Sequence, residues 1–295
     1  MFTIQTHAGR VGQSFHAPTS WSAASALMSE HSSDATVAGG ATYLMWRAAL
    51  GEPMPEHLIS LHRITDHDEV RDGSVGALAT LRRVERGPML GAQRALTMAA
   101  SVTAGPSVRS LATVGGNLAS GFPQADLVPA LLALDATVHF SDGRTLPIGQ
   151  VVESGFKTED LIARVTHDLP SGQGWTGATL KLSRRGMDFS IATVSTVLRL
   201  EKGEIQEARV AVGSLFERPT RLPAIESALL GADPSEETIR EVLEYVKITG
   251  KSFLEDDEAT ASYRQLIAPV AVRRTLLAAA RLGPDGVPRP GEARM

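Results

Sequence analysis

The sequence predicts an α+β fold arranged in two lobes. Its first half alternates short helical and strand patterns. Three strand patterns and then three helical segments follow in the second half, which is the order expected of an α+β arrangement. The chain has 295 residues, which is too long for one small core and suits two domains.

Turn residues divide the first half into short elements. Ser20 is a suitable N-cap for the first helix, and Pro53 and Pro55 end a later one. Asp142-Gly143 marks a hairpin turn. We expect helices at residues 21–30, 43–50, 91–104 and 126–134, and strands at residues 35–38, 58–61, 73–78, 137–140 and 161–165.

The composition changes at residues 171–174, where the sequence reads Ser-Gly-Gln-Gly, so we place a domain boundary there. The first domain is then 1–174 and the second 175–282, with 283–295 as a disordered tail rich in Pro, Gly and charge. The second domain is predicted to hold strands at 178–183, 191–201 and 205–212, and helices at 223–230, 235–249 and 261–282. The apolar stripe of the last helix is predicted to contain Tyr263, Leu266, Ile267, Val270 and Leu277.

Composition excludes several classes of protein. The chain has no cysteine, so it forms no disulfide, has no thiol nucleophile and binds no zinc or iron–sulfur cluster through thiolates. A formal net charge of −4 argues against nucleic-acid binding through a basic face. There is no apolar run of the ~18 residues that a membrane span needs, and the first twenty residues lack a secretory signal. A cytoplasmic location is the default expectation.

Two glycine pairs, Gly39-Gly40 and Gly115-Gly116, are the most informative features. Glycine lets a backbone approach a phosphate closely and lets successive N–H groups point at one anion. Each pair alone is typical of a tight turn, but two such loops with polar neighbours can hold the two halves of a pyrophosphate. Neither loop matches the P-loop or the G-x-G-x-x-G fingerprint, which disfavours a Rossmann dehydrogenase.

Other polar residues allow more than one interpretation. Asp126 is either a hydrogen-bond acceptor for a ligand or the N-cap of the following helix, and the two roles are compatible. His62 and His67 fit no zinc motif and are read as a surface loop. The acidic run at 255–258 is either a solvated loop or a subunit contact.

Five segments, in order, resemble motifs of one family. They are A-G-G-A-T at 38–42, T-V-G-G-N at 113–117, P-Q-A-D-L-V-P-A-L at 123–131, K-L-S-R-R with D-F at 181–189, and Y-R with R-R at 263–274. These resemble, respectively, an A-G-G-x-S loop, a T-[IV]-G-G-N loop, a P-x-x-D-x-x-P-A-L helix, a K-x-x-R-x-x-D-[FWY] segment and a closing helix. On these motifs the chain resembles the FAD-binding medium subunit of molybdenum hydroxylases, over about residues 15–280.

The resemblance implies a fold and a binding site. The N-terminal lobe should be a vanillyl-alcohol-oxidase-type FAD-binding domain of two α/β subdomains. The C-terminal domain should hold a three-stranded antiparallel sheet and a helical bundle, with FAD between the lobes. The implied cofactor-binding residues are Ala38, Gly39, Gly40, Ala41, Thr42, Tyr43, Thr103, Thr113, Val114, Gly115, Gly116, Asn117, Asp126, Ile162 and Lys181. Among these, Lys181 is expected to stabilise an anionic reduced flavin ring, and no residue is expected to be catalytic or to bind a metal.

The resemblance also implies partners. The chain would be the electron-transfer subunit of a heterotrimer, with [2Fe–2S] clusters on a small subunit and molybdopterin on a large one, and the expected assembly is a dimer of heterotrimers. A free-standing FAD oxidase or reductase and a non-redox scaffold are the alternatives. Tyr43, where the family has an aliphatic residue, either stacks on the flavin or packs on its own helix, and Phe122 departs from the family pattern beside Pro123. The substrate and the final electron acceptor are not specified by the sequence.

Overall fold

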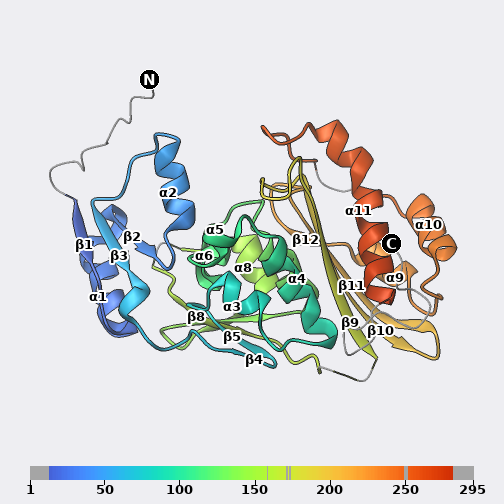
Figure 1. The fold of residues 1–295 in the computed structure, drawn as a ribbon, viewed down its shortest axis with the longest axis horizontal. Coiled ribbons are helices and arrows are strands. Elements are labelled where there is room, and N and C mark those ends of the chain that lie inside the picture. Colours follow the sequence, from blue (N-terminus) through green and yellow to red (C-terminus); the bar gives the residue numbers. More distant parts are fainter. Residues whose placement is uncertain (1–12, 158, 171, 173, 249–251, 282–295) are drawn as a thin grey trace.

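The computed structural model describes residues 13–157, 159–170, 172, 174–248 and 252–281. Three sheets, one in each of three units, follow one another from left to right in Figure 1. The first two units make up the N-terminal lobe and the third the C-terminal lobe. The predicted tail at 283–295 lies outside the described residues.

The first unit is a small parallel sheet with the strand order β1-β3-β2. Helix α1 (Trp21–His31) packs on this sheet through Ala24 and Met28, which share a small separate core with Ile59. The predicted cap is confirmed, because the Ser20 hydroxyl accepts a hydrogen bond from the Ala23 amide at 3.2 Å. The other elements of this unit are β1 (Ser14–His16), the 3₁₀ turn η1 (Ser32–Asp34), β2 (Ala35–Ala38), α2 (Thr42–Ala49), β3 (His57–Ser60) and η2 (Leu61–Arg63).

The second unit is a five-stranded antiparallel sheet with the order β4-β5-β8-β6-β7, covered by short helices. Helix α7 (Leu127–Ala133) is buried along its whole length, as its nearly continuous apolar sequence predicts. The remaining elements are β4 (Val70–Arg71), β5 (Ser74–Gly76), α3 (Leu81–Glu85), η3 (Gly91–Gln93), α4 (Arg94–Val102), α5 (Pro106–Arg109), α6 (Val114–Ala119), β6 (Thr137–Phe140), β7 (Thr145–Pro147), α8 (Ile148–Ser154) and β8 (Ile162–Thr166).

The third unit confirms the expected antiparallel sheet and adds a strand to it. Strands β9 (Trp175–Leu182), β10 (Ala192–Glu201) and β11 (Glu204–Gly213) are the three predicted strands, and β12 (Thr220–Arg221) is a short fourth one. The sheet is buried on both faces: α4 and α7 of the second unit pack on one side, and α11 (Ala261–Arg281) on the other (Figure 1). Helices α9 (Pro223–Ala228) and α10 (Glu236–Tyr245) complete the lobe.

The predicted apolar stripe of α11 is wrong. Leu266 is 71% exposed and Tyr263 45% exposed, whereas Arg264 is fully buried. The face that packs on the sheet consists of small and medium residues, among them Ala268, Ala271, Val272, Thr275, Leu276 and Ala279. The small side chains among them allow the helix to approach the sheet closely.

The longest described helix, α11, has 21 residues and contains several charged side chains. None of the helices in the described part of the chain combines the length and the apolar character that a bilayer crossing requires.

Candidate functional site

A cavity of about 600 Å³ lies where the three units meet. Its walls come from residues 36–47 of the first unit, from residues between 103 and 126 of the second, and from residues 181–189 of the third. The cavity brings together most of the predicted cofactor-binding residues. Those that line it are Ala38, Gly39, Gly40, Ala41, Thr42, Tyr43, Thr103, Thr113, Gly116, Asn117, Asp126 and Lys181.

A second cavity of about 360 Å³ adjoins the first. The two share wall residues from both glycine loops, including Gly39, Thr113 and Gly116. Gly115 and Ile162 line this second cavity and are absent from the walls of the first. Val114 lines neither, because its side chain is fully buried in the core of the second unit.

The first glycine loop leads directly into helix α2. Ala41, the residue before the helix, has the left-handed backbone angle φ = 55°, and no side chain caps the helix. The first-turn amides of a helix have no partner within it. In the described part of the chain, no hydrogen bond from the amides of Thr42, Tyr43 or Leu44 is present. The start of α2 therefore presents free donors and the positive end of a helix dipole at the cavity wall.

The glycines of this loop are required because the two loops touch. A Cβ on Gly40 would overlap the backbone carbonyl of Leu111, and one on Gly39 would collide with the Thr113 hydroxyl. A backbone carbonyl cannot move aside as a flexible side chain can, so Gly40 is the stricter requirement. The sequence predicts a close approach of phosphate at these glycines, and the structure adds a close approach of backbone to backbone.

The second loop is a helix start, not the turn that its glycines suggested. Thr113 caps α6, its hydroxyl accepting from the Gly116 amide at 3.1 Å. The Val114 and Gly115 amides donate to the carbonyls of Ala79 and Ala77, and the Asn117 amide to the Thr113 carbonyl. The backbone donors of this loop are therefore already in use within the protein.

Asp126 and Lys181 form a buried ion pair across the two lobes. The Lys181 Nζ atom lies 3.0 Å from Asp126 Oδ2, and both side chains are less than 5% exposed. Thr193 donates to Asp126 Oδ1 at 2.7 Å, and Lys181 also donates to the Val102 carbonyl at 3.3 Å. The pair places one positive and one negative group at the cavity wall, and each charge compensates the other.

The N-cap interpretation of Asp126 is wrong. Asp126 has helical backbone angles and makes no capping hydrogen bond. The amide of Leu127 instead donates to the Asn117 side-chain oxygen at 3.3 Å. Asn117 thus links the second glycine loop to α7.

Four aromatic rings from three parts of the chain meet at the cavity. Tyr43 and Trp46 of α2 stack at a centroid distance of 5.6 Å, and Phe122 lies 5.3 Å from Tyr43. Phe189 of the C-terminal lobe lies 4.8 Å from Trp46 and 5.1 Å from Phe122. Partial burial raises the pKa of the Tyr43 phenol, against a smaller opposing effect of Arg47. Tyr43 therefore packs on its own helix, one of the two roles considered for it.

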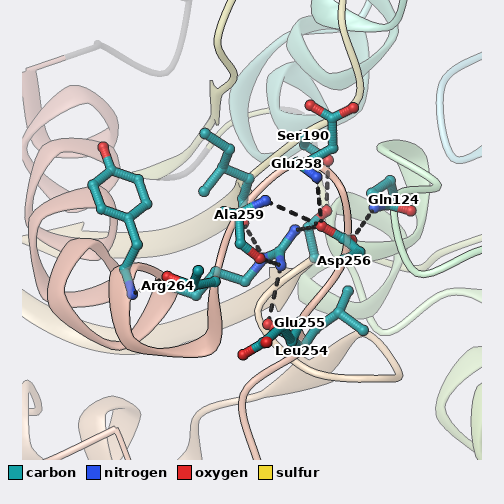
Figure 2. A network of polar contacts seen from close by, with 12 residues as sticks. Gln124, Ser190, Leu254, Glu255, Asp256, Glu258, Ala259 and Arg264 are labelled. Atoms are coloured by element: carbon teal, nitrogen blue, oxygen red, sulfur yellow. Dashed lines mark hydrogen bonds and ion pairs between the residues drawn. The ribbon is translucent and has the colours of Figure 1, made fainter.

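The acidic run at 255–258 is solvated only in part: Glu255 and Asp257 are exposed, whereas Asp256 is held in a polar network. Asp256 accepts hydrogen bonds from the Glu258 and Ala259 amides, from Gln124 and from the fully buried Arg264 (Figure 2). The guanidinium of Arg264 also donates to the carbonyls of Ile191, Leu254 and Ala259. This network ties α11 to Gln124, which lines the cavity two residues before Asp126.

The site suits a dinucleotide cofactor. Free amides at a helix start, beside a loop of glycines, form a binding site for a pyrophosphate. The two adjoining cavities, about 600 and 360 Å³, fall in the range typical of small-molecule and cofactor sites. His67 accepts a hydrogen bond from the Trp21 indole, and His62 pairs with the Ser60 hydroxyl.

Fold and site together define a two-lobed protein with a cavity at the junction of its lobes that suits a nucleotide-containing cofactor. Residues 9–166 match the family described as the FAD binding domain in molybdopterin dehydrogenase. Residues 177–279 match the CO dehydrogenase flavoprotein C-terminal domain. The chain belongs to this family of FAD-binding subunits, which confirms the resemblance, the fold class and FAD as the cofactor.

Individual relatives cover nearly the whole chain. The carbon monoxide dehydrogenase medium chain of Hydrogenophaga pseudoflava is 29% identical over 280 residues, covering 90% of this chain and 96% of the relative. The nicotine 6-hydroxylase medium subunit of Paenarthrobacter nicotinovorans is 26% identical, again over 90% and 96%. These relatives are oxidoreductase subunits.

Solved structures agree with this assignment. The carbon monoxide dehydrogenase of Hydrogenophaga pseudoflava superposes with a TM-score of 0.81 at 27% identity, covering 90% of this chain and 96% of that chain. Quinoline 2-oxidoreductase from Pseudomonas putida 86 has a TM-score of 0.80 at 22% identity, covering 91% and 96%, and shares the fold.

Proposed function

We propose that this chain is the FAD-carrying electron-transfer subunit of a heterotrimeric molybdenum hydroxylase. The observation that supports it best is the single cavity walled by both glycine loops and, from the opposite lobe, by Lys181. Bound FAD would supply electron transfer from the [2Fe–2S] clusters of a small partner subunit to an external acceptor. Substrate hydroxylation would belong to a large partner subunit that carries molybdopterin.

The first loop would hold the pyrophosphate. Its amides at the start of α2 are free donors, and anions bind favourably at helix N-termini. From the second loop, Thr113 and Asn117 would contact the pyrophosphate through their side chains. Gly116 would let the cofactor approach the backbone closely. Val114 would contribute indirectly, because its side chain packs in the core that supports this loop.

The remaining predicted residues divide between the two cavities. Ile162 and Gly115 would pack on the adenine end in the smaller cavity. Thr103, Asp126 and Lys181 would face the flavin end, where the compensated ion pair fixes the ammonium group in place. A positive group held there favours negative charge on a reduced ring.

The absence of cysteine from the chain supports a division of labour between subunits. Cluster ligands would have to come from a partner, and the FAD would be held without a cysteinyl bond. An assembly as a dimer of heterotrimers, a cytoplasmic location and a domain boundary at residue 174 remain predictions that accompany this proposal.

The test has two arms. The purified chain, mixed with FAD and passed through a desalting column, should retain about one flavin per chain, seen from its visible absorption. A tagged copy expressed from its native operon should co-purify with molybdenum- and iron-containing subunits. A colourless chain after FAD addition would refute flavin binding. A yellow chain that oxidised an organic substrate alone, without partners, would favour the free-standing oxidase.

A further inference from the structure

Three histidines from separate segments meet at the outer end of the first unit. They are His16 at the end of β1, His31 at the end of α1 and His57 at the start of β3. One ring nitrogen of each lies within 4.8 Å of the others. Within the described residues this is the only group of three or more His or carboxylate side chains with such spacing.

The fold itself creates this cluster. Ser14 is the register partner of His57, and His16 is two residues further along β1, so both histidines lie on one face of the parallel sheet. Helix α1 packs on this sheet through Ala24 and Met28 and ends at His31. The helix end therefore delivers the third imidazole to the same place as the other two.

The contacts within the cluster are close. His16 Nε2 lies 3.0 Å from His57 Nδ1. The His31 ring stacks on the His57 ring with centroids 3.6 Å apart and planes 7° apart. All three side chains are half-buried. No carboxylate forms a hydrogen bond with these imidazoles in the part of the chain that the structure describes.

We propose that His16, His31 and His57 form a binding site for a divalent transition-metal ion of the Zn²⁺ class. Imidazole nitrogens bind Zn²⁺ at about 2.0–2.1 Å, so two ligand nitrogens lie roughly 3–3.5 Å apart, close to the observed 3.0 Å between His16 and His57. His31 reaches the same ion by turning out of its stack, a rotation open to a half-exposed side chain at a helix end. Three imidazoles leave a fourth position for water.

Two features of the surroundings favour a cation there. The site lies at the C-terminal end of α1, where the helix dipole is negative. The bound ion would also fasten β1, an edge strand of three residues, to β3 and α1. This site is separate from the FAD cavity, since none of the three histidines lines it.

The experiment is a calorimetric titration of the untagged full-length chain, stripped with EDTA, with ZnCl₂. We expect one Zn²⁺ per chain and a higher melting temperature in its presence. His57→Gln and His31→Gln should each weaken Zn²⁺ binding at least about tenfold, since ligands are lost, and abolish the thermal shift. The matched control is His62→Gln, which removes a nearby histidine that bonds Ser60 and is no part of the cluster.

A spectroscopic readout supports the titration. Co²⁺ in place of Zn²⁺ should give visible absorption bands of a nitrogen-ligated ion in the wild type and in His62→Gln, and lose them in His31→Gln. If His57→Gln misfolds by circular dichroism, His31→Gln decides the result. Absence of stoichiometric binding by the wild type at micromolar Zn²⁺, or unchanged binding by folded His31→Gln, would overturn the proposal. Flavin retention is scored separately and does not depend on this site.

Discussion

The two glycine loops look alike in sequence and differ in what they offer a ligand. In the loop at 39–44, the amides at the start of α2 are free and no side chain caps the helix. In the loop at 113–117, Thr113 caps α6 and the neighbouring amides donate to Ala77, Ala79 and Thr113. The first loop therefore offers free donors to an anion, whereas the second loop supports the first.

Contact with the second loop region explains why the first loop needs glycine, and contact with Ala77 explains Gly115 in the second. Gly40 lies against the Leu111 carbonyl, just before the second loop, and Gly115 lies against Ala77. The two glycine pairs thus form one surface. Of the two loops, the first supplies the free backbone donors.

Gly40→Ala should have the largest effect on FAD binding. The new Cβ would overlap the Leu111 carbonyl, so the loop and the start of α2 must shift. Loss of two charge-assisted hydrogen bonds should weaken FAD binding about 100-fold or more, measured by fluorescence titration. ADP, which shares the pyrophosphate, should lose affinity to a similar extent. Gly149→Ala is the control, because a Cβ there meets nothing within 4 Å; a normal affinity in Gly40→Ala would refute the account.

Lys181→Met tests the Asp126–Lys181 ion pair independently of the two glycine loops. The change leaves the buried carboxylate of Asp126 with Thr193 as its remaining side-chain partner, and breaking a buried pair costs about 3–5 kcal/mol. We expect a lower midpoint of chemical unfolding and a lower flavin potential, with ADP affinity nearly unchanged. The double variant Lys181→Met/Asp126→Leu should recover part of the stability. An unchanged flavin potential in the single variant would mean that Lys181 does not act on the flavin.

Thr113→Val should have a smaller effect. It removes the cap of α6 but keeps the shape of the side chain, and loss of such a cap costs about 1 kcal/mol of stability. FAD affinity should fall about fivefold, the value of one hydrogen bond. Thr113→Ser, which keeps the hydroxyl, should behave like the wild type. A loss as large as that of Gly40→Ala would mean that the second loop, not the first, dominates pyrophosphate binding.

Much of the fold could be predicted from local patterns. Strands β2 and β6 and the cap at Ser20 follow from alternation and turn chemistry and are found at the predicted positions. Helix α6 was missed because Val114-Gly115-Gly116-Asn117 has low helix propensity, and the signal lies in the capping hydroxyl of Thr113. The loops and the family motifs were enough to find the cavity.

Interactions between distant segments could not be predicted. The N-cap was one of two roles considered for Asp126, and local sequence does not reveal its partner Lys181, which is 55 residues away. A solvated Asp256 was expected because its partner Gln124, 132 residues earlier, cannot be seen in the local sequence. The burial of Arg264 likewise means that α11 packs through a different face from the predicted one. The three histidines at 16, 31 and 57 share no motif spacing, and they meet because of the parallel register of β1 and β3 and the packing of α1 on that sheet.

Hydrogen exchange of backbone amides, with and without saturating FAD, tests the central claim most directly. The claim is that the free amides at the start of α2 hold the pyrophosphate, while those of the second loop are already bonded within the protein. We expect FAD to slow exchange strongly at Thr42, Tyr43 and Leu44, and to change it little at Val114, Gly115 and Asn117. Strong FAD-dependent protection confined to residues 114–117, with unchanged exchange at 42–44, would contradict it.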